Sequence, residues 1–170
     1  MSRLPDTVSV TFSSAYEQYA GRVRALSGSL TDEQFWTKPY PYGNSFGHLV
    51  LHLTGNLNYF IGTEIAGTGY VRDREREFTD TSKRPKVGVL RDFDAAIEMV
   101  LATVNAQTAE SWSEPYTATG SDHSDRFSIV LHCAAHLNHH VGQMIYLEKE
   151  LHKADLRKAD PRTTDPHKTV

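Results

Sequence analysis

Cysteine and long apolar runs are nearly absent from this chain of 170 residues. The single cysteine, Cys133, excludes an intramolecular disulfide framework and fits a reducing compartment. No window approaches the roughly 20 consecutive apolar residues that span a bilayer, and the opening stretch MSRLPDTVSV lacks the apolar core of a signal peptide. We therefore expect a cytoplasmic protein with no membrane partner.

A strong charge of one sign is also missing. The net charge is −3, and no basic patch is interleaved with aromatic residues, so we expect no nucleic-acid partner. Hydrophobic residues make up 39% of the chain and charged residues 23%, which is close to globular norms. The length suits one domain with a buried core.

What the sequence does contain is apolar residues at three- and four-residue steps, the period of amphipathic helices. This period predicts four long helices, with Asn44 or Ser45 as the N-cap of the second, over residues 8–30, 45–66, 86–109 and 125–152. A short helical turn is expected at residues 31–34. Four long helices with two longer connections predict an all-α fold, a four-helix bundle formed as a single domain by residues 1–152.

The segments between and after these helices differ in composition. Residues 70–85 are dense in charge and predict an ordered but exposed connection, whose alternating charges are solvated. Residues 111–124 contain proline, glycine and small polar residues and predict a loop. Residues 153–170 are polar and lack an apolar period, so we expect a disordered C-terminal tail.

Four of the nine histidines fall between His132 and His140, in the last predicted helix. On a helical wheel of about 100° per residue, His136 and His140 face the apolar side, whereas His132 and His139 lie toward its edge. Positions i and i+4 lie one turn apart on one face, so the two inward imidazoles can converge on one metal ion. A single buried histidine is more often hydrogen-bonded in a core. Two side by side in an apolar seam each need a buried partner, and a metal ion serves both.

The second predicted helix carries two candidates for a third ligand, His48 and His52. His52 lies closer to the apolar side of its wheel, so we predict His52 as the ligand and place His48 on the rim. Chance placement is the alternative, because the chain is rich in histidine. Cys133, one turn before His136, is interpreted as a buried thiol that fills space rather than as a fourth ligand. The motif HExxH is absent, so zinc-protease chemistry gains no support.

Two polar residues flank the predicted ligands. Asn56, one turn after His52, can hydrogen-bond a ligand histidine, or it can pair with the backbone or with water. Gln143 lies beside the ligand face and can orient a ligand or a substrate, or it can form part of a polar rim. No side chain is assigned a catalytic role.

At these residues the chain resembles the DinB-like superfamily of helical metalloproteins. The resemblance rests on NSFGHLVLHLTGN in the second predicted helix and HLNHHVGQMIYLEKE in the last, and it extends over residues 15–151. With YVRDREREF included, the chain resembles, more narrowly, a bacterial branch of unassigned function. The resemblance implies an up-up-down-down-like bundle, often a homodimer, in which His52, His136 and His140 hold a divalent metal. Characterised members of the superfamily include transferases and isomerases that use a low-molecular-weight thiol.

Three histidine ligands leave a coordination position open for water or substrate, which is the arrangement of catalytic sites. We predict zinc or nickel as the metal, with iron and copper as alternatives, and a small molecule as the substrate. The resemblance favours transfer of a low-molecular-weight thiol to an electrophile. The competing interpretations are a non-catalytic metal-binding or stress-linked module, and a helical interaction bundle that uses the charged residues 72–77.

Overall fold

Helices form the regular secondary structure of this protein. The structure is a computed structural model that describes residues 4–118 and 122–159. Within those residues the β-structure is limited to an isolated antiparallel bridge between Pro115 and Asp125. The elements in chain order are α1 Leu4–Gly28, α2 Asp32–Trp36, α3 Phe46–Leu57, the π-helical segment η1 Asn58–Thr63, α4 Arg76–Thr79, α5 Lys86–Asn105, α6 Ala109–Trp112 and α7 Arg126–Ala159. The predicted all-α class is confirmed.

Side-chain caps fix where several helices begin. Thr31 accepts a hydrogen bond from the Gln34 amide, and the Gln34 side chain accepts one from the Thr31 amide, which forms a capping box at the start of α2. Ser45 caps α3 through the His48 amide, so the second of the two predicted N-caps is the one used. Such caps satisfy amides that have no intrahelical partner.

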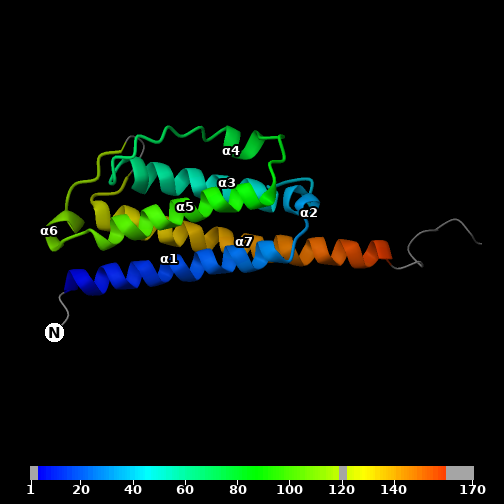
Figure 1. Cartoon of the computed structure of the whole chain (residues 1–170), viewed down its shortest axis with the longest axis horizontal. Coiled ribbons are helices and arrows are strands. Elements are labelled where there is room, and N and C mark those ends of the chain that lie inside the picture. Colours follow the sequence, from blue (N-terminus) through cyan, green and yellow to red (C-terminus); the bar gives the residue numbers. More distant parts are fainter. Residues whose placement is uncertain (1–3, 119–121, 160–170) are drawn as a thin grey trace, which may run out of the picture.

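The longest helices pack side by side (Figure 1), with α1 and α3 each lying against both α5 and α7. Ser9, near the start of α1, donates to the carbonyl of Val104 near the end of α5, so these two helices are antiparallel. Tyr16, in the middle of α1, donates to the carbonyl of Val130 near the start of α7, and Ser29, just after α1, donates to Glu148 farther along α7, so α1 and α7 are parallel. One hydrophobic core contains residues from α1, α3, α5 and α7, and also from the short helices α2 and α6.

The order of helix directions differs from the predicted one. Helices α3 and α5 run the same way and opposite to α1 and α7 (Figure 1), which gives up, down, down, up along the chain instead of up-up-down-down. Two consecutive parallel helices need a connection that returns along their whole length. Residues 64–85 provide it, crossing the outside of α3 and contacting it through α4.

Several helix boundaries differ from the sequence prediction, among them those of α1, which spans Leu4–Gly28 instead of residues 8–30. The second predicted helix changes to π-helical geometry at Asn58. Helix α5 ends at Asn105, before the expected residue 109. Helix α7 continues past the expected end at His152 to Ala159, because residues 153–159 contain neither glycine nor proline and are mostly good helix formers. Of the predicted disordered tail, residues 160–170 lie outside the described residues.

None of the described helices is both long enough and apolar enough to cross a membrane.

Candidate metal centre

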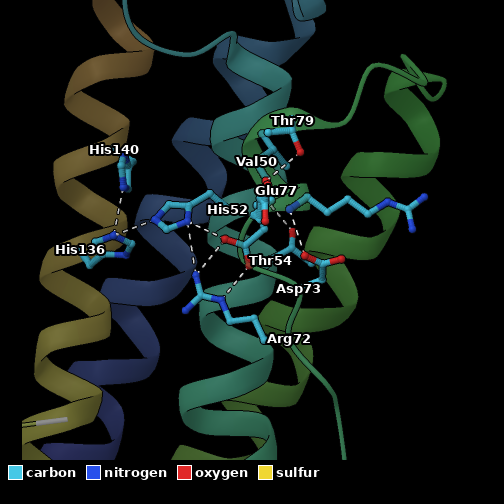
Figure 2. Close-up of polar contacts among 11 residues, drawn as sticks. Val50, His52, Thr54, Arg72, Asp73, Glu77, Thr79, His136 and His140 are labelled. Atoms are coloured by element: carbon cyan, nitrogen blue, oxygen red, sulfur yellow. Dashed lines mark hydrogen bonds and ion pairs between the residues drawn. The ribbon is translucent and has the colours of Figure 1, made fainter. Parts of the chain in front are cut away.

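Three histidines from two helices meet in the seam between α3 and α7 (Figure 2). His52 projects from α3, and His136 and His140 project from α7 one turn apart. The Nε2 atoms of His52 and His136 are 3.2 Å apart, and those of His136 and His140 are 3.0 Å apart. One ligand atom from each residue lies within 4.8 Å of the other two. These are the three residues that the sequence predicted as a set.

Hydrogen bonds among the three histidines cannot satisfy all of their inward-facing nitrogens. Glu77 Oε2 lies 2.8 Å from His52 Nδ1, and Gln143 Oε1 lies 2.7 Å from His140 Nδ1. Each of these oxygens accepts a hydrogen from the Nδ1 atom that it faces, so the Nε2 atoms of both histidines carry lone pairs. His136 Nε2 lies between the two lone pairs and can donate to only one of them. His136 Nδ1 is buried and has no hydrogen-bond partner within the described part of the chain.

A divalent cation fits this arrangement better than protons do. Imidazole nitrogens bind zinc at about 2.0–2.1 Å in tetrahedral geometry, which separates neighbouring ligand atoms by about 3.3 Å. The two Nε2–Nε2 distances, 3.2 and 3.0 Å, are close to that value. A cation at the common focus accepts all three lone pairs at once, whereas hydrogen bonding leaves at least one pair of nitrogens opposed.

The surroundings keep the cluster in the neutral form that binds metal. Burial, followed by the neighbouring His140 and His52, lowers the pKa of His136 to about 3. Burial also lowers the pKa of His140, although its hydrogen bond to Gln143 acts in the opposite direction. Neutral imidazole is the ligand form, so no proton has to be displaced from these two residues near neutral pH.

Glu77, from the segment between α3 and α5, holds the outer nitrogen of His52 (Figure 2). This carboxylate is only 6% exposed. Arg72 donates to both of its oxygens, from Nε at 2.7 Å and from an Nη at 2.9 Å. Burial by itself raises the pKa of Glu77, but the hydrogen bonds from His52 and Arg72 outweigh it and leave the pKa below its usual value. Glu77 is therefore ionised and fixes the tautomer of His52, as carboxylates do behind metal-bound histidines.

A glycine on α3 makes room for this carboxylate. A Cβ atom built on Gly55 would lie 2.0 Å from Glu77 Oε1, far inside any permitted contact. Gly55 follows His52 by three positions and therefore lies on the same side of the helix. The bare backbone at this position is what lets the carboxylate approach the histidine.

The segment 70–85 corrects the prediction of a wholly exposed, solvated charge run. Arg74 and Glu75 are exposed as expected, whereas Glu77 is buried and Arg72 is largely covered. Sequence reasoning missed Arg72 and Glu77 as partners of the site. A charge run with one member facing inward has the same composition as one that is fully solvated, so only Gly55 next to His52 hinted at a close neighbour.

Gln143, Asn56 and Cys133, the other residues that the sequence singled out, have different surroundings in the structure. Gln143 places its Oε1 atom 2.7 Å from His140 Nδ1. Asn56 is buried, its side-chain oxygen has no hydrogen-bond partner among the described residues, and Glu77 occupies the place beside His52 that Asn56 was expected to take. Cys133 is fully buried, and burial raises the pKa of its thiol to about 12, which fits a space-filling role.

The remaining histidines near the site also have distinct environments. His132 and His139 are exposed, as predicted. His48 was expected on the rim but is buried, because its Nδ1 contacts Ser45 Oγ at 2.6 Å and its Nε2 donates to the carbonyl of Asp80 at 3.0 Å. Both ring nitrogens of His48 have hydrogen-bond partners, so His48 has a structural role.

Comparison with protein families gives one match over most of the chain. Residues 10–160 match the family described as "Protein of unknown function (DUF1572)". The chain belongs to this family. Neither the curated proteins nor the solved structures contain a match.

Proposed function

We propose that this member of the DUF1572 family binds one divalent metal ion through His52, His136 and His140 and uses it in catalysis. The observation that carries the proposal is the convergence of three Nε2 atoms that hydrogen bonds cannot pair. Within the described residues, the group of potential ligands contains three members and no fourth cysteine, aspartate or glutamate. A site with three protein ligands is the catalytic type, whereas structural zinc sites have four.

Residues around the three histidines would orient the ligands and balance the charge of such a site. Glu77 and Gln143 hold the outer nitrogens of His52 and His140, which aims both inner lone pairs at one point. The ion pair between Arg72 and Glu77 adds no net charge. A bound divalent cation would supply positive charge that stabilises an anionic substrate group.

The resemblance to DinB-like proteins supplies a finer proposal: a DinB-like four-helix bundle that transfers a low-molecular-weight thiol to an electrophilic small molecule. In that reaction the thiol sulfur forms a bond to an electrophilic carbon. The leaving group departs with its electron pair, and the thiol proton passes to solvent. Zinc or nickel is the expected metal, because imidazole ligands suit both.

Metal content tests the site directly. Protein purified from medium supplemented with zinc and nickel should hold about one metal ion per chain by elemental analysis. His52→Ala, His136→Ala and His140→Ala should each lose most of it. His132→Ala removes an exposed histidine from the same helix and should lose none. If the three ligand substitutions leave the metal content unchanged, the three-histidine site is wrong.

Catalysis is tested separately from binding. Metal-loaded protein is incubated with an electrophile such as monochlorobimane and with glutathione, bacillithiol or mycothiol in turn. Conjugation that depends on the metal and disappears in His136→Ala supports the transferase. Retained metal with no turnover for any of the three thiols supports the alternative, a non-catalytic metal-binding module.

A further inference from the structure

A cavity of 310 Å³ lies beside the histidine cluster, between α3, α7 and the segment that precedes α3. Ligand-binding pockets typically start at about 300 Å³, so this cavity has the size for a small molecule. We call it the tyrosine pocket. The lining residues that matter here are Tyr40, Tyr42, Leu49, Gln143, Tyr146 and Leu147.

The walls of the tyrosine pocket are aromatic and its floor is aliphatic. The rings of Tyr40 and Tyr42 stack with their centroids 5.6 Å apart and their planes 9° apart. Tyr42 is 74% exposed and Tyr146 is 73% exposed, whereas Leu49 and Leu147 below them are buried. Two large aromatic side chains that folding leaves uncovered, gathered around one cavity, are a feature of binding surfaces rather than of cores.

The tyrosine pocket continues the line of the metal ligands along α7. His136, His140, Gln143 and Leu147 follow one another at steps of four, three and four residues, so they lie on one face of the helix. Gln143 lines the pocket and holds His140 Nδ1 at 2.7 Å. The rise of α7 from His140 to Leu147 is about 10 Å, within the length of a two-ring molecule.

We propose that the tyrosine pocket binds a planar aromatic ring of the substrate and orients the polar end of that substrate toward the histidine cluster. The ring packs against the stacked Tyr40–Tyr42 pair and Tyr146, above the leucine floor. The substrate class is an aromatic compound carrying an anionic or otherwise metal-binding group. The inference rests on the proposed metal site, which supplies the partner for that group.

Calorimetric titration of the zinc-loaded protein with 2-naphthoate tests the pocket. Tyr42→Ala and Tyr146→Ala should each weaken binding by about five- to tenfold, the usual loss when an aromatic anchor is truncated. Tyr42→Phe and Tyr146→Phe keep the rings and should stay within about twofold of wild type, since ring stacking does not need the hydroxyl. Cyclohexanecarboxylate, which is not planar, should bind more weakly than 2-naphthoate.

Zinc content, measured on the same samples, separates the two proposals. A wild-type protein without zinc contradicts the proposed function. Full zinc content with no 2-naphthoate binding, or with equal affinity in the alanine variants, overturns the tyrosine pocket alone. His136→Ala should also weaken 2-naphthoate binding, because the carboxylate loses its cation. Equal affinity in that variant overturns the link between the pocket and the metal.

Discussion

His48 and His52 lie one turn apart on α3 and are both buried, yet their surroundings are opposite. His48 contacts the Ser45 hydroxyl and the Asp80 carbonyl, so each of its nitrogens has a partner from the fold. His52 has Glu77 on one nitrogen and faces other imidazoles with the second. Burial therefore does not distinguish a structural histidine from a ligand. The hydrogen-bond partners of the two ring nitrogens make the distinction, because a metal ligand needs one lone pair that the protein leaves available.

Substituting the two histidines in parallel gives the largest expected difference. His52→Ala removes a metal ligand. It should lower metal affinity by more than the roughly 10- to 100-fold lost when a residue that hydrogen-bonds to a ligand is substituted. His48→Ala should keep one metal ion per chain but lower the free energy of unfolding by about 1–3 kcal/mol, since the Asp80 carbonyl and the Ser45 hydroxyl both lose their hydrogen bond to the imidazole. Elemental analysis and urea unfolding measure the two effects. Loss of metal in both variants would contradict the distinction.

Glu77→Gln tests the hydrogen-bond partner that distinguishes the surroundings of His52 from those of His48. The amide oxygen can still accept from His52, but the charge that balances Arg72 is lost. We expect metal affinity to fall by about 10- to 100-fold and stability to fall by about 3–5 kcal/mol. Metal titration with a chromophoric chelator and thermal unfolding measure these changes.

Two further variants isolate the contribution of Glu77. Glu75→Gln, at an exposed position of the same segment, should change neither quantity. Arg72→Gln combined with Glu77→Gln removes both buried charges, so it should recover stability but not metal affinity. Full recovery of affinity in the double variant would mean that Glu77 does not position His52.

Gly55→Ala tests the space that lets Glu77 reach His52. The added methyl group displaces the carboxylate of Glu77 from His52. Metal affinity should therefore fall by up to about tenfold, the lower end of the loss caused by substituting residues that hydrogen-bond to metal ligands. Gly21→Ala is the control, because a Cβ atom there meets nothing within 4 Å. It should raise stability by up to about 1 kcal/mol through helix propensity and leave the metal affinity unchanged. Unchanged affinity in Gly55→Ala would show that Glu77 can move without consequence.

Acid should destabilise the metal-free histidine cluster. The pKa of His136 is about 3 in the folded protein and about 6.5 in an unfolded chain. The unfolded state therefore binds the proton first, and stability present above about pH 6.5 is lost as the pH falls toward 3. One such histidine contributes at most about 1.4 kcal/mol per pH unit. Thermal unfolding between pH 7 and pH 5 should show a smaller decrease for His136→Gln than for the wild type.

Ser45→Ala has a small expected effect and leaves the surroundings of His52 unchanged. It removes the N-cap of α3 and the contact to His48 Nδ1, so the free energy of unfolding should fall by about 1–2 kcal/mol. The metal content should stay at the wild-type level, by the same elemental analysis. A loss of metal would show that the two histidine environments are coupled along α3.

Local sequence rules predicted much of the fold and the central part of the site. The three- and four-residue periods located the long helices, and N-cap preferences narrowed the start of α3 to Asn44 or Ser45, of which the structure uses Ser45. Helical spacing also selected His136, His140 and His52, because periodicity fixes which residues share a face. The π-helical segment was not predicted, since it has no periodic signature of its own.

The sequence by itself determined the helical class and the three histidines, because both follow from the geometry of single helices. Only the tertiary structure decided the partners around them: the buried Glu77 and Arg72, the fully bonded His48, and the direction of α3 relative to α1. These depend on where residues 64–85 cross α3. Long-range packing sets that crossing, and no local pattern encodes it, although Gly55 leaves the space that it needs.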